Sequence, residues 1–274
     1  MSTPADALAH RSPAPLTTGE APPIVAIGAG KGGVGTSTVA ALLAATAAAD
    51  GLRVLLIDAS QHFGGLGALL GVEPALTLAD LRGGAHSLHD VVVPVSARLS
   101  LVCAGYTPAG VSPTEHQLLL RRLADLYREY ALVVIDAGAS AASLRNAIRC
   151  GATRVLAVTA HDRIALMSTY ALVKLLHDQA PGMRVDVLAN RVDHDAAGRL
   201  HDYLNGASVR FLSRTVPFAG LIPDDPAFER VIAAGLGTDE AALGSPAAAA
   251  VREIGAQLLA DTAAPPFLRL LRKG

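Results

Sequence analysis

A glycine-rich segment between an apolar run and an alanine-rich run constrains this chain more than any other feature. Residues 30–37 read Gly-Lys-Gly-Gly-Val-Gly-Thr-Ser, after an apolar run at 24–27 that suits a buried strand and before a helical pattern at 38–49. Strand, glycine loop and helix in this order direct the N–H groups and partial positive charge of a helix N-terminus at a bound anion. A glycine turn without a ligand is the alternative, but the nearly complete spacing favours a phosphate-binding loop.

The loop departs from the usual pattern at one important position. A phosphate-binding loop reads G-x-x-x-x-G-K-[ST], and its lysine contacts the outer phosphates. Gly30, Gly35 and Ser37 occupy the expected places, but Thr36 stands where the lysine belongs, and Lys31 directly follows the first glycine. Losing a fixed cation is expected to cost several kcal/mol of binding and transition-state stabilisation together. The function therefore depends on whether the loop still binds a nucleotide and whether it hydrolyses one.

Short apolar runs alternate with helical patterns along the whole chain. Continuous apolar strands between helices indicate a parallel sheet that is covered on both faces. The expected strands are 24–27, 54–57, 99–102, 132–135, 154–159 and 185–190. A helix is predicted after Asp162, and a capping box of Ser112 and Glu115 predicts another. The predicted fold class is α/β, a doubly wound and mostly parallel sheet with helices on both faces, whose ligand lies at the carboxyl ends of the strands.

Composition sets limits on size and partners. The 274 residues, of which 51% are hydrophobic, suit one large domain, and the net charge of −1 predicts no specific nucleic-acid partner. Two cysteines predict reduced thiols in a cytoplasmic protein, and no apolar run approaches the ~20 residues of a membrane span. We expect a flexible arm at 1–22, a nucleotide-binding domain at 23–262 and a basic amphipathic tail at 263–274.

Two aspartates at strand ends suggest a magnesium site beside the loop. Asp58 and Asp136 each follow an apolar run, and Ser37 adds a hydroxyl oxygen. Mg²⁺ binds one or two carboxylates together with phosphate oxygens and keeps several waters. Either aspartate alone could instead cap the next helix. With the loop upstream, the pattern favours Ser37, Asp58 and Asp136 as metal ligands.

The segment Lys31–Gly35 resembles the deviant Walker A loop of the MinD/ParA superfamily of P-loop ATPases. Three further segments, at 58–71, at 112–116 and at 170–177 with 187–192, are similar to the flagellar number regulators of the FleN/FlhG type. The resemblance implies ATP and Mg²⁺ as cofactors and a nucleotide-linked homodimer, in which the early lysine crosses to the partner's phosphates. It also implies contacts of Asn190 with adenine and a base pocket at residues 222–225. The predicted nucleotide-binding residues are Gly30, Lys31, Gly32, Gly33, Val34, Gly35, Thr36, Ser37, Thr38, Asn190, Arg191, Pro223 and Asp224.

This chain departs from that family at positions whose side chains are expected to support hydrolysis. Besides Thr36, Ser60 replaces the second aspartate of the family's first switch, and residues 136–140 differ from its second switch. We therefore expect an ATP-binding switch that regulates flagellar number or placement, with weak or absent hydrolysis and no assignable catalytic residue. A pseudo-ATPase scaffold without nucleotide dependence is the alternative from another class. A related regulator of pilus assembly or cellulose export is a third possibility.

The last residues of the chain combine apolar side chains with three cations. Phe267, Leu268, Leu270 and Leu271 resemble the membrane-targeting tail of MinD-like proteins. A short basic amphipathic segment can lie in the lipid interface, with its cations toward anionic lipid. A last helical turn docked on the protein body is the alternative. We expect a cytoplasmic protein with peripheral contact at the inner face of the membrane.

Overall fold

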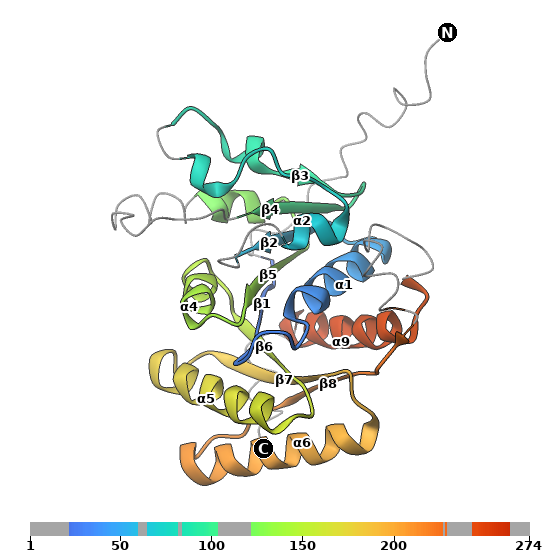
Figure 1. The fold of residues 1–274 in the computed structure, drawn as a ribbon. Helices are drawn as coiled ribbons and strands as arrows, with labels where there is room; N and C mark the ends of the chain where they lie inside the picture. Colours follow the sequence, from blue (N-terminus) through green and yellow to red (C-terminus); the bar gives the residue numbers. More distant parts are fainter. Residues whose placement is uncertain are drawn as a thin grey trace.

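The computed structural model describes residues 22–59, 65–81, 84–103, 122–226, 228 and 243–263. Over these residues the chain forms one sheet with the strand order β3-β4-β2-β5-β1-β6-β7-β8 (Figure 1). All neighbouring strands are parallel except β3 and β4. The strands are β1 (Ile24–Gly28), β2 (Val54–Asp58), β3 (Val93–Pro94), β4 (Leu99–Cys103), β5 (Leu132–Gly138), β6 (Arg154–Thr159), β7 (Arg184–Asn190) and β8 (Phe218–Ile222). The predicted doubly wound α/β class is confirmed.

Helices cover both faces of this sheet, as Figure 1 shows. One face is covered by α1 (Thr36–Ala49), α2 (Gly65–Leu70) and α9 (Pro246–Ala263). The other is covered by α4 (Ala141–Arg149), α5 (Arg163–Gln179) and α6 (His194–Leu212), and short 3₁₀ turns lie at η2 (Leu78–Leu81) and η3 (Leu88–Val91). Because both faces are covered, the inner strands are buried along their whole length, which explains their uninterrupted apolar runs. The helix predicted at Ser112 lies outside the described residues.

Helix α1 owes its alanine-rich sequence to its position between the sheet and α9. Its residues from Val39 to Ala48 are all buried. A Cβ added at Gly255 of α9 would lie 3.0 Å from Leu43 Cδ1, so the two helices are in close contact. Small side chains on both helices allow this approach, because a larger residue would push them apart.

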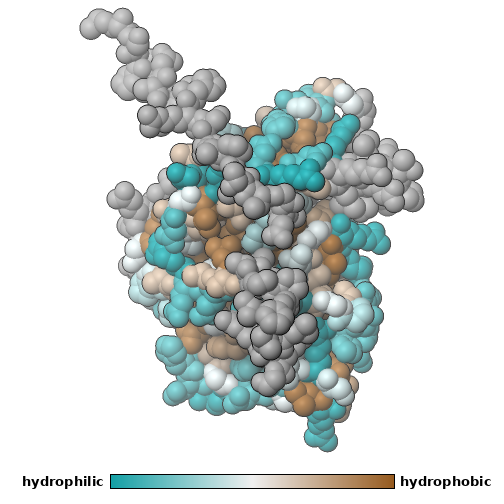
Figure 2. Space-filling model, turned by 180° about the vertical axis from the view of Figure 1, so that it is seen from behind, coloured by the Kyte–Doolittle hydropathy of each residue, from teal (hydrophilic) through white to brown (hydrophobic). Residues whose placement is uncertain are grey.

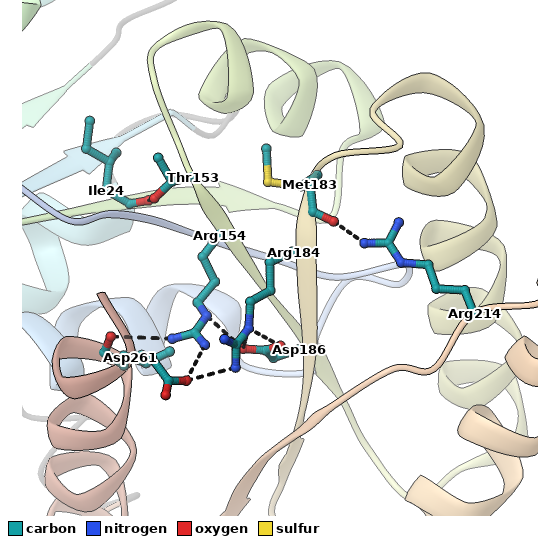
Figure 3. Close-up of polar contacts among 9 residues, drawn as sticks. Ile24, Thr153, Arg154, Met183, Arg184, Asp186, Arg214 and Asp261 are labelled. Carbon is teal, nitrogen blue, oxygen red and sulfur yellow. Dashed lines mark hydrogen bonds and ion pairs between the residues drawn. The ribbon is translucent and has the colours of Figure 1, made fainter. Parts of the chain in front are cut away.

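A buried ion-pair network fixes the last turns of α9 to the amino ends of β6 and β7 (Figure 3). Arg154 Nε lies 2.8 Å from Asp186 Oδ2, and Arg154 Nη2 lies 2.7 Å from Asp261 Oδ2. Arg184 pairs with both carboxylates, at 3.1 Å and 2.8 Å. Arg154 and Asp186 are almost fully buried, and their charges are tolerated there because each is paired and hydrogen-bonded.

The surface carries several exposed apolar side chains. They are Ile164 and Met167 on α5, Tyr203, Val209 and Phe211 on α6, and Phe218 on β8. From the side drawn in Figure 2, apolar residues form separate patches between hydrophilic ones. None of the helices in the described part of the chain is both long and apolar enough to cross a membrane.

Candidate nucleotide-binding site

The glycine loop leaves β1 near the middle of the sheet and leads directly into α1. Gly33 and Gly35 have φ values of 81° and 91°, a left-handed conformation that favours glycine. Gly35 is the N-cap of α1, and no side chain caps the helix there. The first N–H groups of α1 are therefore available to an anion, as a phosphate-binding loop requires.

The first glycine of the loop packs against the backbone of α5. A Cβ added at Gly30 would lie 2.0 Å from the carbonyl oxygen of Ser168 and 2.8 Å from the backbone nitrogen of Thr169. A Cβ added at Gly32 would meet nothing within 4 Å. Gly30 thus fixes the spacing between the loop and α5, which any side chain would increase.

Lys31, the lysine of the loop, is paired within the same chain. Its Nζ lies 3.2 Å from both carboxylate oxygens of Asp162. Asp162 is also the N-cap of α5, where its Oδ1 accepts hydrogen bonds from the backbone N–H groups of Ile164 and Ala165. The N–H of Ala165, together with Lys31, lowers the pKa of Asp162 below its usual value, so this carboxylate is ionised at neutral pH.

Asn190, at the end of β7, supports the loop from behind. Its side-chain Nδ2 donates a 2.8 Å hydrogen bond to the carbonyl oxygen of Val34, and only 5% of the residue is exposed. A Cβ added at Gly35 would lie 2.5 Å from that same nitrogen. The amide predicted to contact adenine is therefore engaged with the loop backbone in this structure.

A cavity of about 330 Å³ opens between the loop, α1 and the residues after β8. This volume is at the lower end of the range for small-molecule sites, ~300–1,000 Å³. Arg191 and Asp224 lie at 3.5 Å from each other, while Asp225 accepts hydrogen bonds from the N–H groups of Phe228 and Ala247. The lining residues are Gly33, Gly35, Thr38, Val39, Leu42, Asn190, Arg191, Ile222, Pro223, Asp224, Asp225 and Phe228. An apolar wall with a polar rim suits a planar heterocycle.

The two predicted metal-binding carboxylates are neighbours across the sheet. Asp58 of β2 is directly opposite Asp136 of β5 in the register, and both continue the strand positions that face α1. Asp136 is fully buried, and its Oδ1 accepts a 2.9 Å hydrogen bond from the N–H of Gly138. Its Oδ2 is buried and has no hydrogen-bond partner among the described residues.

Burial raises the pKa of Asp136, and the nearby charge of Asp58 raises it further, against hydrogen bonds from Ser37 and Gly138 that lower it. Two like charges side by side, with one buried oxygen unsatisfied, are costly without a cation. Ser37 reaches the same carboxylate. The oxygen-only donor set fits a hard divalent ion such as Mg²⁺.

The structure thus brings most of the predicted site residues together around one region. Gly33, Gly35, Thr38, Asn190, Arg191, Pro223 and Asp224 line the cavity, and Ser37, Asp58 and Asp136 meet beside it. Gly30 and Lys31 contact α5 instead, while Ser60 lies outside the described residues. The roles of all these residues in nucleotide and metal binding stay predictions.

Sequence reasoning missed Asp162 as the partner of Lys31, and Val39, Leu42 and Phe228 as cavity residues. Val39 and Leu42 are three positions apart on one face of α1, a spacing that also describes an ordinary core helix. The only available signal was that they directly follow the loop.

Comparison with known proteins agrees with this geometry. The family model described as the CobQ/CobB/MinD/ParA nucleotide binding domain matches residues 25–238. The antiactivator FleN of Pseudomonas aeruginosa is 31% identical over 213 residues, which are 76% of each chain. The septum site-determining protein MinD of Synechocystis is 27% identical over 208 residues, 74% of this chain and 76% of its own.

Solved structures share the fold at lower sequence identity. MinD of Pyrococcus horikoshii, solved with Mg-ADP, superposes with a TM-score of 0.68 at 21% identity and covers 88% of this chain and 97% of its own. Strand order, glycine loop and sequence agree on one conclusion: this chain belongs to the CobQ/CobB/MinD/ParA family of nucleotide-binding domains.

Proposed function

We propose that this protein is a MinD-like switch that binds ATP with Mg²⁺ and hydrolyses it slowly or not at all. The observation that carries the proposal is the uncapped glycine loop of α1 opening onto the 330 Å³ cavity. The N–H groups at the start of α1 suit the phosphates, and the cavity beyond Thr38 suits the base. The relative from Pyrococcus horikoshii was solved with Mg-ADP, which supports the same ligand class here.

Mg²⁺ would be held by Ser37, Asp58 and Asp136, and it would neutralise charge on the outer phosphates. Asp136 fits this role because its buried Oδ2 has no partner among the described residues. Ser37 lowers the pKa of Asp136, which supports placing its hydroxyl beside the same ion.

Weak hydrolysis follows from the charges of the loop. Thr36 brings no cation to the position where the loop lysine normally stabilises transferred charge, and Lys31 is already paired with Asp162. A fixed cation of this kind typically contributes a factor of about 10² or more to the rate. The protein would therefore keep its nucleotide-bound state for long periods.

Such a switch would act by binding other proteins. The similarity to FleN, an antiactivator, supports a regulatory role, and the flagellar-type segments favour regulation of flagellar number or placement over pilus assembly or cellulose export. We further propose a nucleotide-linked homodimer and a peripheral membrane contact through the basic tail at 263–274, with a flexible arm at 1–22.

The second candidate is a pseudo-ATPase scaffold. Two features favour it, because together they leave no unpaired charge in the loop: Lys31 is paired with Asp162, and Thr36 is uncharged. Calorimetric titration of the full chain with ATP and Mg²⁺, and with ADP for comparison, separates the two. The switch predicts binding with preference for ATP, and a Ser37→Ala variant should lose much of its magnesium dependence. Absence of binding at millimolar ATP would favour the scaffold.

A further inference from the structure

The second half of α6 exposes two aromatic side chains beside a cation. Tyr203 is 59% exposed and Phe211 is 66% exposed. Tyr203, Arg210 and Phe211 have the spacing i, i+7 and i+8, which brings them to one side of a helix. The guanidinium carbon of Arg210 lies 5.3 Å from the centre of the Phe211 ring. With Arg214, which directly follows the helix end, these residues form what we call the α6-end surface.

The α6-end surface is positively charged. Residues 203–223 contain Arg210 and Arg214 but no acidic residue. Arg214 donates its hydrogen bonds to backbone carbonyl oxygens, which do not neutralise its charge. Asp202 comes just before this segment and Asp178 is in the last turn of α5, so acids lie at its borders. Exposed aromatic rings among cations suit a partner that is apolar inside and negatively charged outside.

Contacts drawn in Figure 3 connect this surface to the end of α9. Arg214 donates hydrogen bonds to the carbonyl oxygens of Met183 and, at 3.3 Å, of Pro181. The next residue after Met183 is Arg184, which begins β7 and lies 2.8 Å from Asp261 of α9. The basic tail that follows α9 therefore starts at the same edge of the sheet as the α6-end surface.

We propose that the α6-end surface is a second contact with anionic lipid, which lies on the membrane together with the basic tail. The inference rests on the peripheral membrane contact of the proposed function. Phe211 enters the lipid interface, while Arg210 and Arg214 stay at the level of the lipid phosphates. The glycine loop and its cavity lie at the opposite, carboxyl ends of the strands, so lipid and nucleotide do not compete for one site.

The size of the effect follows from the two kinds of group. One cation close to an anionic surface contributes about a fivefold factor to the binding constant. Partial burial of an exposed phenylalanine ring contributes a similar factor, about fivefold. Because the tail and the α6-end surface are linked, these factors multiply the binding of the tail. Losing Arg210 and Phe211 together should weaken lipid binding about 10- to 30-fold.

Co-sedimentation of the full chain with vesicles, in the presence of ATP and Mg²⁺, measures this loss. The test variant carries Arg210→Gln and Phe211→Ser, and the vesicles contain phosphatidylglycerol and phosphatidylcholine. Arg163→Gln with Ile164→Ser is a matched control, since it removes a neighbouring cation and a 64% exposed apolar residue at the opposite end of the sheet. We expect the control to bind like the wild type. Vesicles of phosphatidylcholine alone should bind all three proteins weakly.

A fluorescent reporter tests whether the surface itself enters the lipid. The chain contains no tryptophan, so Phe211→Trp introduces a single indole, and Ile164→Trp provides the control. We expect the emission of Phe211→Trp to shift to shorter wavelength on the anionic vesicles and to be quenched by brominated lipid. The emission of Ile164→Trp should do neither.

Each other result counts against the inference. If the test variant binds vesicles like the wild type, or if Phe211→Trp shows no shift while bound, the α6-end surface faces water or a protein partner and the tail alone holds the membrane. A shift at both tryptophan positions would indicate general adsorption and also overturn the inference. If the wild type does not sediment with anionic vesicles at all, the proposed membrane contact of the tail and the inference both fail.

Discussion

Replacing Gly30 with alanine should strain the contact between the glycine loop and α5. The added Cβ would lie 2.0 Å from the oxygen and 2.2 Å from the carbon of the Ser168 carbonyl, whereas real Cβ atoms essentially never come closer than 3.0 Å. The loop and helix must therefore separate by at least about 1 Å. Both contacting groups are backbone, so no side chain can rotate away, and Leu172 and Leu176 of α5 are buried against the sheet.

Overpacking typically costs about 1–3 kcal/mol. Because a whole helix must shift, we expect Gly30→Ala to lower the free energy of unfolding by about 3 kcal/mol, or the melting temperature by roughly 6–12 °C for a domain of this size. Urea denaturation followed by far-UV circular dichroism measures the change. Gly32→Ala is the control, because its Cβ meets nothing within 4 Å and its φ is not positive. A loss below about 1 kcal/mol for Gly30→Ala, or equal losses for both variants, would refute the reasoning.

Three further substitutions or measurements test other parts of the structure. Arg154→Met leaves the buried carboxylate of Asp186 with a single partner and should cost about 3–5 kcal/mol in urea denaturation; a cost under 1 kcal/mol would contradict the role of the network. The pKa of Asp136 is raised in the folded protein. Its ionisation therefore lowers the free energy of unfolding at pH values above that pKa and has no effect on it below a pH of about 3.8. Asp136→Asn should therefore stabilise the nucleotide-free protein at pH 7, with a gain that disappears as the pH falls toward 4; a gain independent of pH would argue against a buried charge. Burial and the charge of Asp58 raise the pKa of Cys103 to about 11, so only about one thiol in a thousand is ionised at pH 8 and Cys103 should react with Ellman's reagent only after unfolding. Rapid reaction of Cys103 in the native protein would show that the thiol is accessible.

The sequence predicted the inner strands and the strand-end aspartates well because both follow from local patterns. A strand buried on two faces needs an uninterrupted apolar run, and β2 and β5 have one that ends at the residue where side chains reach the ligand edge. Parallel pairing of β2 with β5 then places Asp58 opposite Asp136 without further information. The edge strand β8 (Phe-Ala-Gly-Leu-Ile) was not predicted, because Gly220, with a φ of 138°, interrupts its apolar side chains and only Ile222 is fully buried.

The contacts between the glycine loop and distant side chains could not be predicted in this way. Lys31 and Asp162 are separated by 131 positions, and they meet only because Gly30 allows α5 to approach. Asn190 shows the same limit: its place at the end of β7 indicates a position near the ligand, whereas its hydrogen bond to Val34 depends on the exact path of the loop. Local patterns determine which edge a residue reaches, while long-range packing determines its partner.

The packing of α9 on α1 has a consequence for the order in which this chain acquires its structure. Helix α1 is complete by Ala49, yet the helix that buries its outer face begins only at Pro246, almost two hundred residues later. During synthesis that apolar face stays uncovered until α9 emerges, and so long a sequence separation slows folding. The hydrogen bond from the N–H of Ala247 to Asp225 likewise forms only after Ala247 has been synthesised. Among the described residues, the wall of the cavity is therefore one of the later parts to form, and a nascent chain that has already made its glycine loop still lacks the complete pocket that we propose for the nucleotide.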